Sequence, residues 1–113
     1  FVRMDGQIVG YVGLEFIDGK TVLLKHLAVQ KEYRKRRIGV TLFDHAVQFA
    51  RSRGATTAAF VTMYYHFNRF KRRGFRTCPR RFLPENVRNN WMFTSKRYMK
   101  CAAMIQEFLP QAD

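Results

Sequence analysis

Cysteine, proline and acidic side chains are scarce in this sequence of 113 residues. It holds 2 cysteines, 3 prolines and 8 Asp and Glu residues, against 21 Lys and Arg residues. Cys78 and Cys101 lack the close spacing of a redox or zinc motif. This favours reduced thiols in a cytoplasmic protein without a metal, and a disulfide or a metal pair is the alternative.

Long apolar runs are also missing. A membrane-spanning helix needs roughly 18 consecutive apolar residues, and no segment of the sequence approaches that length. The charged-then-apolar pattern of a secretory signal is not visible either. The sequence therefore predicts a cytoplasmic protein with no membrane partner.

The residues that are present favour one folded domain with an anionic partner. Hydrophobic residues make up 47% of the chain and aromatic residues 15%, well above the range of disordered proteins. The length suits a single core, so residues 1–113 are expected to form one domain. The formal net charge of +13 implies an anionic partner, either a nucleic acid or a small polyphosphate.

Two Asp-Gly pairs divide the N-terminal part into strands. Asp5-Gly6 and Asp18-Gly19 each lie between β-rich runs, which is typical of two-residue hairpin turns. The predicted antiparallel strands cover residues 1–4, 7–17 and 20–29. Apolar residues occupy both alternating sets of the second strand, so helices are expected on both faces of the sheet.

A two-residue second turn also fixes which side chains share a face. It places Glu15 opposite Val22, and therefore on the other face of the sheet from Leu23. On this register His26 shares the face of Glu15, and Lys25 shares the face of Leu23.

The hydrophobic period changes after the third strand. Apolar residues at three- and four-residue spacing predict a helix that begins at Ile38 and ends close to Gly54. A short buried strand is predicted over 55–62, and a second helix over 64–73. The run 91–108 is ambiguous, because its later part suits either a last strand or a helix. The order is β-β-β-α-β-α-β, then a loop and a last element, which predicts an α/β (α+β) domain.

The segment HLAVQKEYRKRRIGV joins the third strand to the first helix. The strand ends near Val29, a polar loop with the consecutive cations Arg34–Arg37 follows, and the helix begins at Ile38. A helix start has unsatisfied N–H groups and a partial positive charge, so it can bind a phosphate. Gly39 would let such a ligand approach the backbone closely. The alternative is a solvated charged loop before an ordinary helix.

This segment resembles the acetyl-CoA loop and helix of the GNAT (N-acetyltransferase) superfamily. The stretch LAVQKEYRKRRIGVTLFDHAVQFARSRGA is similar to a strand ending in hydrophobic-x-Val and an R/Q-x-x-G-x-G/A loop that wraps the CoA pyrophosphate. Arg34 matches the first position of the loop motif and Gly39 the last. Arg37 stands where the family has its middle glycine, and it keeps the main-chain donor if it adopts the backbone angles of that glycine.

Two further stretches extend the resemblance. YYHFNRFKRRGFR is similar to the family's second helix and the strand after it, with Phe70 at the position of a tyrosine that often protonates the CoA thiolate. Phe is frequent there in the amino-acid N-acetyltransferase branch, which includes the N-acetylglutamate synthases. The tail resembles that branch through Leu83-Pro84, Val87, Cys101 and Ala103-Met104.

The resemblance implies a fold, a co-substrate and the residues that hold it. The fold is a GNAT-like mixed, mostly antiparallel sheet with helices on both faces. The usual N-terminal strand and two helices are absent from this sequence, so we expect an N-terminally truncated domain, or an acceptor side that is reduced or supplied by another chain. The co-substrate is acetyl-CoA. The residues implied to bind it are Leu27, Ala28, Val29, Arg34, Lys35, Arg36, Arg37, Ile38, Gly39, Val40, Phe70 and Arg72.

The implied activity is transfer of an acetyl group from acetyl-CoA directly to a primary amine, with an amino-acid α-amine suggested by the branch. Many relatives carry a catalytic Glu at the position of Leu23, so the base and the acid stay unassigned. The nearest substitutes and candidate proton donors are Glu15, His26, Tyr64 and Tyr65. Lys25 could attract an acceptor carboxylate.

Two other functions are open at this stage. A nucleic-acid-binding module would use the cations of 31–37 and 69–81, with Phe70 and Phe75 as stacking rings. A degenerate family member would bind CoA without catalysis. The expected partners are thus acetyl-CoA and a small amine or amino acid, with nucleic acid and a homodimer left open.

Overall fold

A computed structural model describes residues 1–4, 6–63 and 66–108, and for residues 26, 27 and 34–36 it describes the backbone alone. The strands are β1 (Val2–Met4), β2 (Gln7–Phe16), β3 (Thr21–Val29), β4 (Thr57–Thr62), β5 (Arg76–Cys78) and β6 (Ala102–Glu107). The helices are α1 (Ile38–Ser52), α2 (Phe67–Lys71), α3 (Glu85–Arg88) and α4 (Trp91–Thr94). Short 3₁₀ helices are η1 (Lys31–Arg36), η3 (Arg80–Phe82) and η4 (Lys96–Tyr98).

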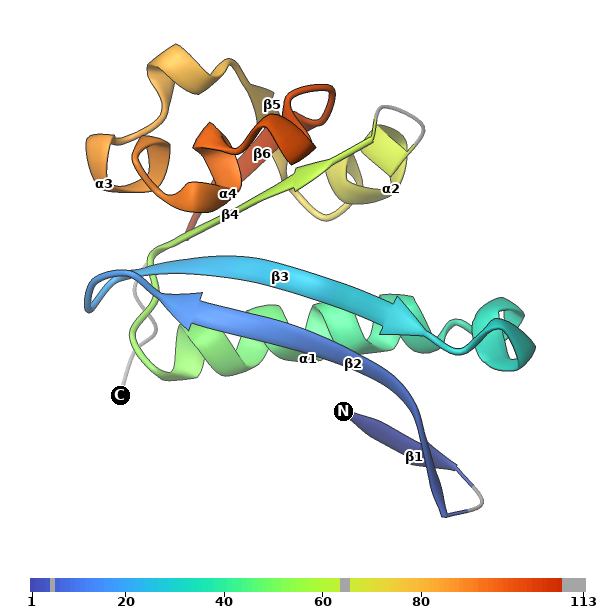
Figure 1. Ribbon diagram of the computed structural model, residues 1–113. Helices are drawn as coiled ribbons and strands as arrows, with labels where there is room; N and C mark the ends of the chain where they lie inside the picture. Colours follow the sequence, from blue (N-terminus) through green and yellow to red (C-terminus); the bar gives the residue numbers. More distant parts are fainter. Residues whose placement is uncertain (5, 64–65, 109–113) are drawn as a thin grey trace.

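The strands form one sheet of order β1-β2-β3-β4-β6-β5 (Figure 1). The β3–β4 pair is parallel and the other pairs are antiparallel. This confirms the predicted mixed, mostly antiparallel sheet. The long helix α1 runs along β2 and β3, whereas α3 and α4 lie beside the β4–β6 half of the sheet (Figure 1).

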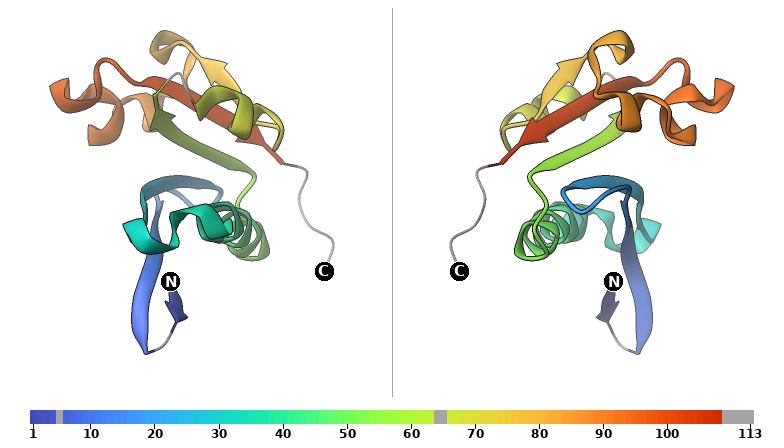
Figure 2. Two further views of the ribbon diagram at one scale, coloured as in Figure 1. Left: turned by 90° about the vertical axis from the view of Figure 1, so that its right-hand side faces the viewer. Right: turned by 90° about the vertical axis from the view of Figure 1, so that its left-hand side faces the viewer.

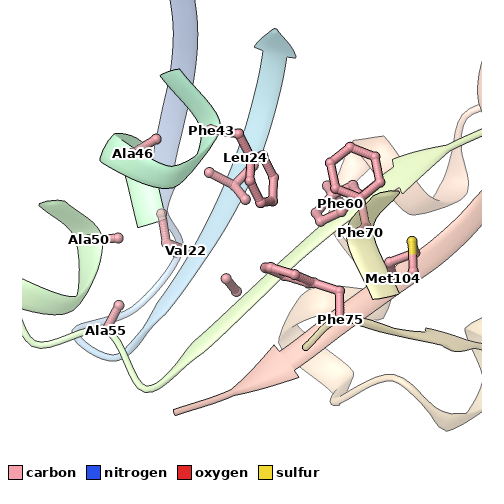
Figure 3. Packing of buried hydrophobic residues seen from close by; sticks show 11 residues of the cluster. Val22, Leu24, Phe43, Ala46, Ala50, Ala55, Phe60, Phe70, Phe75 and Met104 are labelled. Atoms are coloured by element: carbon pink, nitrogen blue, oxygen red, sulfur yellow. The ribbon is translucent and has the colours of Figure 1, made fainter. Parts of the chain in front are cut away.

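Helices lie on both faces of the sheet, as predicted, but the second strand is not buried on both of its own faces, because Ile8, Tyr11 and Phe16 of β2 stay exposed. On one face, a cluster of buried phenylalanines joins α1, β4, α2 and the start of β5 (Figure 3). Their ring centroids lie 4.7–5.7 Å apart in tilted and edge-to-face pairs, a favourable aromatic geometry. On the other face, η3, α3 and α4 cover Leu23 and its neighbours on β4 and β6.

Glycines end the helices where the sequence predicted. Gly54 has φ +98° after α1, and the amide of Ala55 donates to the carbonyl of Ala50 at 3.0 Å. Gly74 has φ +90° after α2. Left-handed glycines of this kind satisfy the last carbonyls of a helix, so α1 stops before the chain enters β4.

The first hairpin also agrees with its prediction. Met4 pairs with Gln7, and Gly6 has φ +77°, as a two-residue turn requires. Asp5 lies outside the described residues.

The second hairpin corrects the predicted register by one residue. Ile17 donates its amide to the carbonyl of Thr21 at 3.0 Å, so the loop spans Asp18–Lys20. Asp18 Oδ1 accepts the amides of Lys20 at 2.6 Å and of Thr21 at 2.7 Å. This side-chain turn replaces the two-residue turn, and it places Glu15 opposite Leu23 instead of Val22. Glu15 therefore shares the face of Leu23, and the opposite assignment was wrong.

The C-terminal part has more secondary structure than its sequence showed. The ambiguous last run contains α4, η4 and then β6, so the segment around Cys101–Ile105 belongs mainly to a strand. The predicted loop after β5 contains η3 and α3. The predicted second helix is shorter, because α2 covers Phe67–Lys71, and Tyr64 and Tyr65 lie outside the described residues. No helix in the described part of the chain is both long enough and apolar enough to cross a membrane.

Candidate functional site

The parallel strands β3 and β4 separate after a short pairing. Their ladder covers only Thr21–Leu23 of β3 with Thr57–Ala59 of β4. Beyond these rungs β4 continues along β6 to Thr62, while β3 continues along β2 to Val29. The views in Figure 2 show the two halves of the sheet diverging. The second half of β3 therefore turns one backbone edge away from any partner strand in the described sheet.

An irregularity in β3 marks the start of this open edge. The register shifts between Tyr11↔Ala28 and Gly13↔Lys25, so His26 and Leu27 together oppose Val12. Bulges of this kind bend a strand and are frequent next to active sites. Here the bulge follows the rungs that hold β3 to β4.

Hydrogen bonding to β2 determines which backbone groups face the open edge. The amide of Gln30 donates to the carbonyl of Val9 at 2.7 Å. Because antiparallel ladders alternate, the next pair, Gly10↔Val29, directs the polar groups of Val29 away from β2. Ala28 comes one residue earlier, and its backbone faces Tyr11.

The cation-rich loop leads from this edge into α1. Lys31–Arg36 form η1, and Arg37 follows with φ 60° and ψ 21°. Arg37 is the sole non-glycine residue with positive φ among those described. A side chain in this left-handed region costs on the order of 1–3 kcal/mol, and such strain gathers at functional sites. Arg37 thus adopts a glycine-like backbone where the resembling family keeps a glycine.

The N-terminus of α1 lies beside the end of β3. A Cβ built on Gly39 would lie 3.6 Å from Cγ2 of Val29. Arg37 gives no side-chain cap to the helix. The amide of Thr41 donates to the carbonyl of Arg37 at 3.1 Å, so the amides of Ile38, Gly39 and Val40 belong to the first turn of α1, the part of a helix whose N–H groups are available to an outside partner. They form a positive helix end next to the strand edge, which suits a phosphate.

Gly10 of β2 allows α1 to lie close to β2 and β3. A Cβ at Gly10 would lie 2.9 Å from Cδ1 of Leu42, 3.2 Å from the carbonyl oxygen of Ala28 and 3.3 Å from Cγ2 of Ile38. Only a residue without a side chain fits between α1 and the strands at this point. Sequence analysis did not single out this glycine.

The predicted cofactor residues fall into two groups. Leu27, Ala28, Val29 and the run Arg34–Val40 occupy one continuous stretch from β3 through η1 to the first turn of α1. Phe70 lies elsewhere, buried in the aromatic cluster with its ring centroid 4.9 Å from Phe43 and 4.7 Å from Phe60. Arg72 is exposed at the end of α2.

The burial of two rings bears on the nucleic-acid alternative. Phe70 is 9% exposed and Phe75 is 3% exposed, so neither ring presents a face on which a base could stack. Phe70 and Phe75 therefore do not act as stacking rings for a nucleic acid. The excess of positive charge is the remaining basis for that alternative.

Glu15 and Lys25 form an ion pair on the sheet face that carries Leu23. Lys25 Nζ donates to Glu15 Oε1. Asn90 Nδ2 lies 3.4 Å from Glu15 Oε2, and the Asn90 side chain also accepts the amide of Met92 at the start of α4. The hydrogen bond from Lys25 lowers the pKa of Glu15 below its ordinary value. The predicted two-residue turn placed these two side chains on opposite faces, so the sequence alone did not indicate the pair.

A cavity of about 130 Å³ opens where β3 and β4 separate. Its lining combines strand residues with residues of α4 and η4, namely Leu24, Lys25, Val61, Trp91, Met92 and Tyr98. Trp91 and Tyr98 meet edge-to-face, with ring centroids 5.6 Å apart. Lys25 is the one charged side chain in this lining, within the part of the chain that the structure describes.

Arg80 holds the outer wall of the cavity together. Its guanidinium donates to three carbonyl oxygens, those of Phe93 at 3.1 Å, Tyr98 at 2.7 Å and Cys101 at 2.9 Å. These contacts join the end of α4, η4 and the turn before β6. One side chain thus fixes the segment that carries Trp91 and Tyr98.

The remaining reactive side chains include two thiols and the possible metal ligands. Cys78 and Cys101 are both free thiols. Among residues 1–4, 6–63 and 66–108, no three His, Cys, Asp or Glu side chains gather so that they could hold a metal ion. The side chain of His26, one of the candidate substitutes for a base, is not described.

Comparison with known proteins gives consistent matches. The sequence model of the acetyltransferase (GNAT) family matches residues 1–75. The probable N-acetyltransferase camello of Xenopus tropicalis is 32% identical over 101 residues, which are 85% of this chain and 46% of that protein. An uncharacterized N-acetyltransferase of Chlorobaculum tepidum is 27% identical over 82 residues, 73% of this chain and 52% of that protein. The chain spans about half the length of these relatives.

Solved structures share the fold. N-acetylglutamate synthase from Neisseria gonorrhoeae, complexed with coenzyme A and N-acetyl-glutamate, matches 94% of this chain and 24% of its own, with a TM-score of 0.75 and 21% identity. Rv2747 from Mycobacterium tuberculosis, in complex with CoA and NLQ, matches 94% of this chain and 71% of its own, with a TM-score of 0.77 and 18% identity.

Proposed function

Because this chain belongs to the GNAT acetyltransferase family, we propose that it transfers the acetyl group of acetyl-CoA directly to a primary amine. The observation that carries the proposal is the open edge of β3 running into the left-handed Arg37 and the start of α1. This continuous stretch offers backbone donors to an extended ligand and then a positive helix end to its phosphates. The two solved neighbours named above hold CoA.

The predicted cofactor residues take different roles in this proposal. The backbone of Leu27–Val29 binds the pantetheine arm in the manner of an added strand. The run Arg34–Val40 binds the pyrophosphate, through main-chain amides and through its cations. The exposed Arg72 meets the 3′-phosphate. Phe70 supports the site from the core, because its ring is packed among other aromatic side chains.

Acetyl transfer needs several catalytic groups, and only one of them is assigned in this proposal. The acceptor must be a neutral amine when it attacks, the thioester carbonyl needs a hydrogen-bond donor, and the leaving thiolate needs a proton. A backbone amide of the open edge of β3 is the proposed donor to the carbonyl. Leu23, at the position of the relatives' carboxylate, is fully buried and apolar.

An amino-acid α-amine is the proposed acceptor. The tail of the chain, with Leu83-Pro84 before α3 and Ala103-Met104 in β6, resembles the amino-acid N-acetyltransferase branch. One solved neighbour is an N-acetylglutamate synthase with N-acetyl-glutamate bound. These likenesses support the class of acceptor and leave the side chain of the amino acid open.

Calorimetric titration with acetyl-CoA tests the proposal at its first step. We expect binding in the micromolar range, about 8 kcal/mol of binding free energy. Release of free thiol on addition of amines or amino acids then tests catalysis. Binding without thiol release across a broad acceptor panel would instead support a degenerate CoA-binding domain.

A loop variant tests the assignment of the phosphate site. Arg34→Ala should weaken acetyl-CoA binding, whereas Arg53→Ala, which removes an exposed cation after the far end of α1, should leave it unchanged. Equal affinities for the two variants would mean that the phosphates bind elsewhere.

A further inference from the structure

We propose that the cavity at the separation of β3 and β4 binds the acceptor, and that this acceptor is an α-amino acid with an apolar or aromatic side chain. The inference rests on the proposed acetyltransferase function and narrows its substrate. Three features of the described residues support it: the position of the cavity, its lining, and the ion pair at its polar end.

The position of the cavity places it at the reacting end of a bound acetyl-CoA. Leu24 and Lys25 follow the last rung of the β3–β4 ladder, and Val61 lies on the separated part of β4. The open edge of β3 leads from this point to the start of α1. A ligand with its phosphates at α1 would therefore direct its other end toward the cavity.

The lining of the cavity selects an apolar group of limited size. Val61, Trp91, Met92 and Tyr98 form most of its wall. The cavity is partly open and partly polar, and its volume of about 130 Å³ is close to that of an enclosed apolar cavity that accepts benzene, so it suits a branched aliphatic or single-ring side chain. Among the described residues of this lining, a second carboxylate, as in glutamate, would meet no further cation and would lose hydration without a partner.

The ion pair at the polar end matches the two charges of a zwitterion. Lys25 lines the cavity, and Glu15 stands beside it on β2. The α-carboxylate of an amino acid can take the place of Glu15 on Lys25, which leaves its ammonium next to the released Glu15. Asn90, already within 3.4 Å of Glu15, can hold the freed carboxylate in place.

The proposed acetyl transfer then proceeds in three steps, in which every bond and proton is accounted for. The acceptor ammonium gives one proton to the Glu15 carboxylate, and the neutral nitrogen forms a bond to the thioester carbonyl carbon. The C–S bond breaks, and a second proton of the nitrogen passes to the departing sulfur. Glu15 returns its proton to water, so the products are the N-acetyl amino acid, free CoA and one proton.

The test compares acceptors that differ in one feature at a time. Thiol release from acetyl-CoA is measured with L-phenylalanine, L-leucine, L-glutamate and 2-phenylethylamine, the last being phenylalanine without its carboxylate. Loss of a charged hydrogen bond corresponds to roughly tenfold or more in kcat/KM. We therefore expect phenylalanine and leucine to exceed both glutamate and 2-phenylethylamine by at least about tenfold.

Variants of Lys25 and Glu15 test whether this ion pair recognises the carboxylate of the acceptor. Lys25→Met should remove the preference for phenylalanine over 2-phenylethylamine and leave acetyl-CoA affinity unchanged. Lys20→Met, which removes an exposed cation in the turn before β3, is the matched control and should keep the preference. The double variant Glu15→Lys/Lys25→Glu retains an ion pair, which supports folding, and should lose turnover of both amino acids.

The outcomes separate the two proposals. Intact acetyl-CoA binding with glutamate or 2-phenylethylamine as the better acceptor overturns this inference and leaves the acetyltransferase function standing. An unchanged preference in Lys25→Met has the same consequence. Failure of the wild-type chain to bind acetyl-CoA removes the proposed function, and this inference with it.

Discussion

Glu15 lies directly opposite Leu23 in the antiparallel pair of β2 and β3, and its carboxylate binds Lys25 on the same face of the sheet. Leu23 is fully buried under α3 and α4 and presents no polar group. The neighbouring strand thus supplies a carboxylate one strand spacing away, roughly 5 Å. A charged pair occupies the face on which the proposed acceptor cavity opens.

Replacing Arg37 by glycine tests whether the backbone of this residue, rather than its side chain, serves the proposed phosphate site. Its φ of 60° is strained for a side chain, so Arg37→Gly should raise the free energy of unfolding by about 1 kcal/mol. Acetyl-CoA affinity should stay within about threefold, or 0.7 kcal/mol, of the wild type. Urea denaturation and calorimetry measure the two quantities.

Arg37→Val is the matched contrast. A β-branched side chain is a steric outlier at positive φ, so this variant should lose stability and bind acetyl-CoA more weakly. If Arg37→Gly loses affinity as strongly as Arg37→Val does, the guanidinium itself binds the ligand and the backbone account is wrong.

Gly10→Ala should disturb the approach of α1 to the sheet. The new Cβ would lie 2.9 Å from Leu42 Cδ1 and 3.2 Å from a backbone oxygen, and overpacking of this kind costs about 1–3 kcal/mol. Because the first turn of α1 must move, acetyl-CoA affinity should fall as well. Thermal denaturation and calorimetric titration report the two effects.

The control for this variant is Gly19→Ala in the second turn. A Cβ at Gly19 meets no atom within 4 Å, and the residue does not have a left-handed φ. Stability and affinity should therefore stay at wild-type values. A loss of similar size in both variants would show that the tight contact at Gly10 is unimportant.

The parts of the fold that follow from local patterns could be predicted from the sequence. The period of α1 and its end at Gly54, the turn before Gln7, and the presence of helices on both sheet faces each follow from neighbouring residues. The cation-rich connection between β3 and α1 and the start of α1 at Ile38 depend on local sequence in the same way. Its role in binding CoA stays a prediction.

Features that depend on side chains meeting across the fold could not be predicted. Asp18 accepts a hydrogen bond from the distant Asn86 of α3, and the turn that its side chain forms with the amides of Lys20 and Thr21 shifts the register, which moves Glu15 to the other face. Arg80 is one of many cations in the sequence, and nothing local distinguishes it as the one that binds three carbonyls. The wall of the proposed acceptor cavity depends on these contacts of Arg80.

Arg80→Met should loosen the wall of the acceptor cavity. Three carbonyl oxygens lose a charged donor, and partial hydration of the freed groups leaves a loss of about 2–4 kcal/mol in the free energy of unfolding. Amide hydrogen exchange should accelerate across residues 90–101 more than across β2 and β3. Turnover of the acceptor should fall, whereas acetyl-CoA affinity should change little.

Arg81→Met is the control for the Arg80 variant. Arg81 is exposed and its guanidinium lies over the Phe82 ring at 4.7 Å. Its removal should alter neither exchange across residues 90–101 nor turnover. Uniform acceleration over the whole chain in Arg80→Met would instead indicate a global loss of stability without a specific role in the cavity.

Asp18 should make the fold sensitive to acid. Hydrogen bonds from the amides of Lys20 and Thr21, and one from Asn86 of α3, lower the pKa of this carboxyl below its ordinary value. A group with a depressed folded-state pKa binds its proton more readily when unfolded. Its contribution to stability is present above the unfolded-state pKa, near pH 4, and is lost as the pH falls through the folded-state pKa.

The variant Asp18→Asn separates the pH-dependent contribution of Asp18 to stability from the contributions of the other carboxyl groups. The amide oxygen of asparagine can still accept the two backbone amides, but it does not titrate in this range. The urea midpoint of the wild type should therefore fall more steeply between about pH 5 and pH 3 than that of Asp18→Asn. Parallel pH profiles would mean that the turn carboxyl contributes nothing to acid sensitivity. Glu15, whose pKa is also lowered, would then account for the slope, and Glu15→Gln should flatten it.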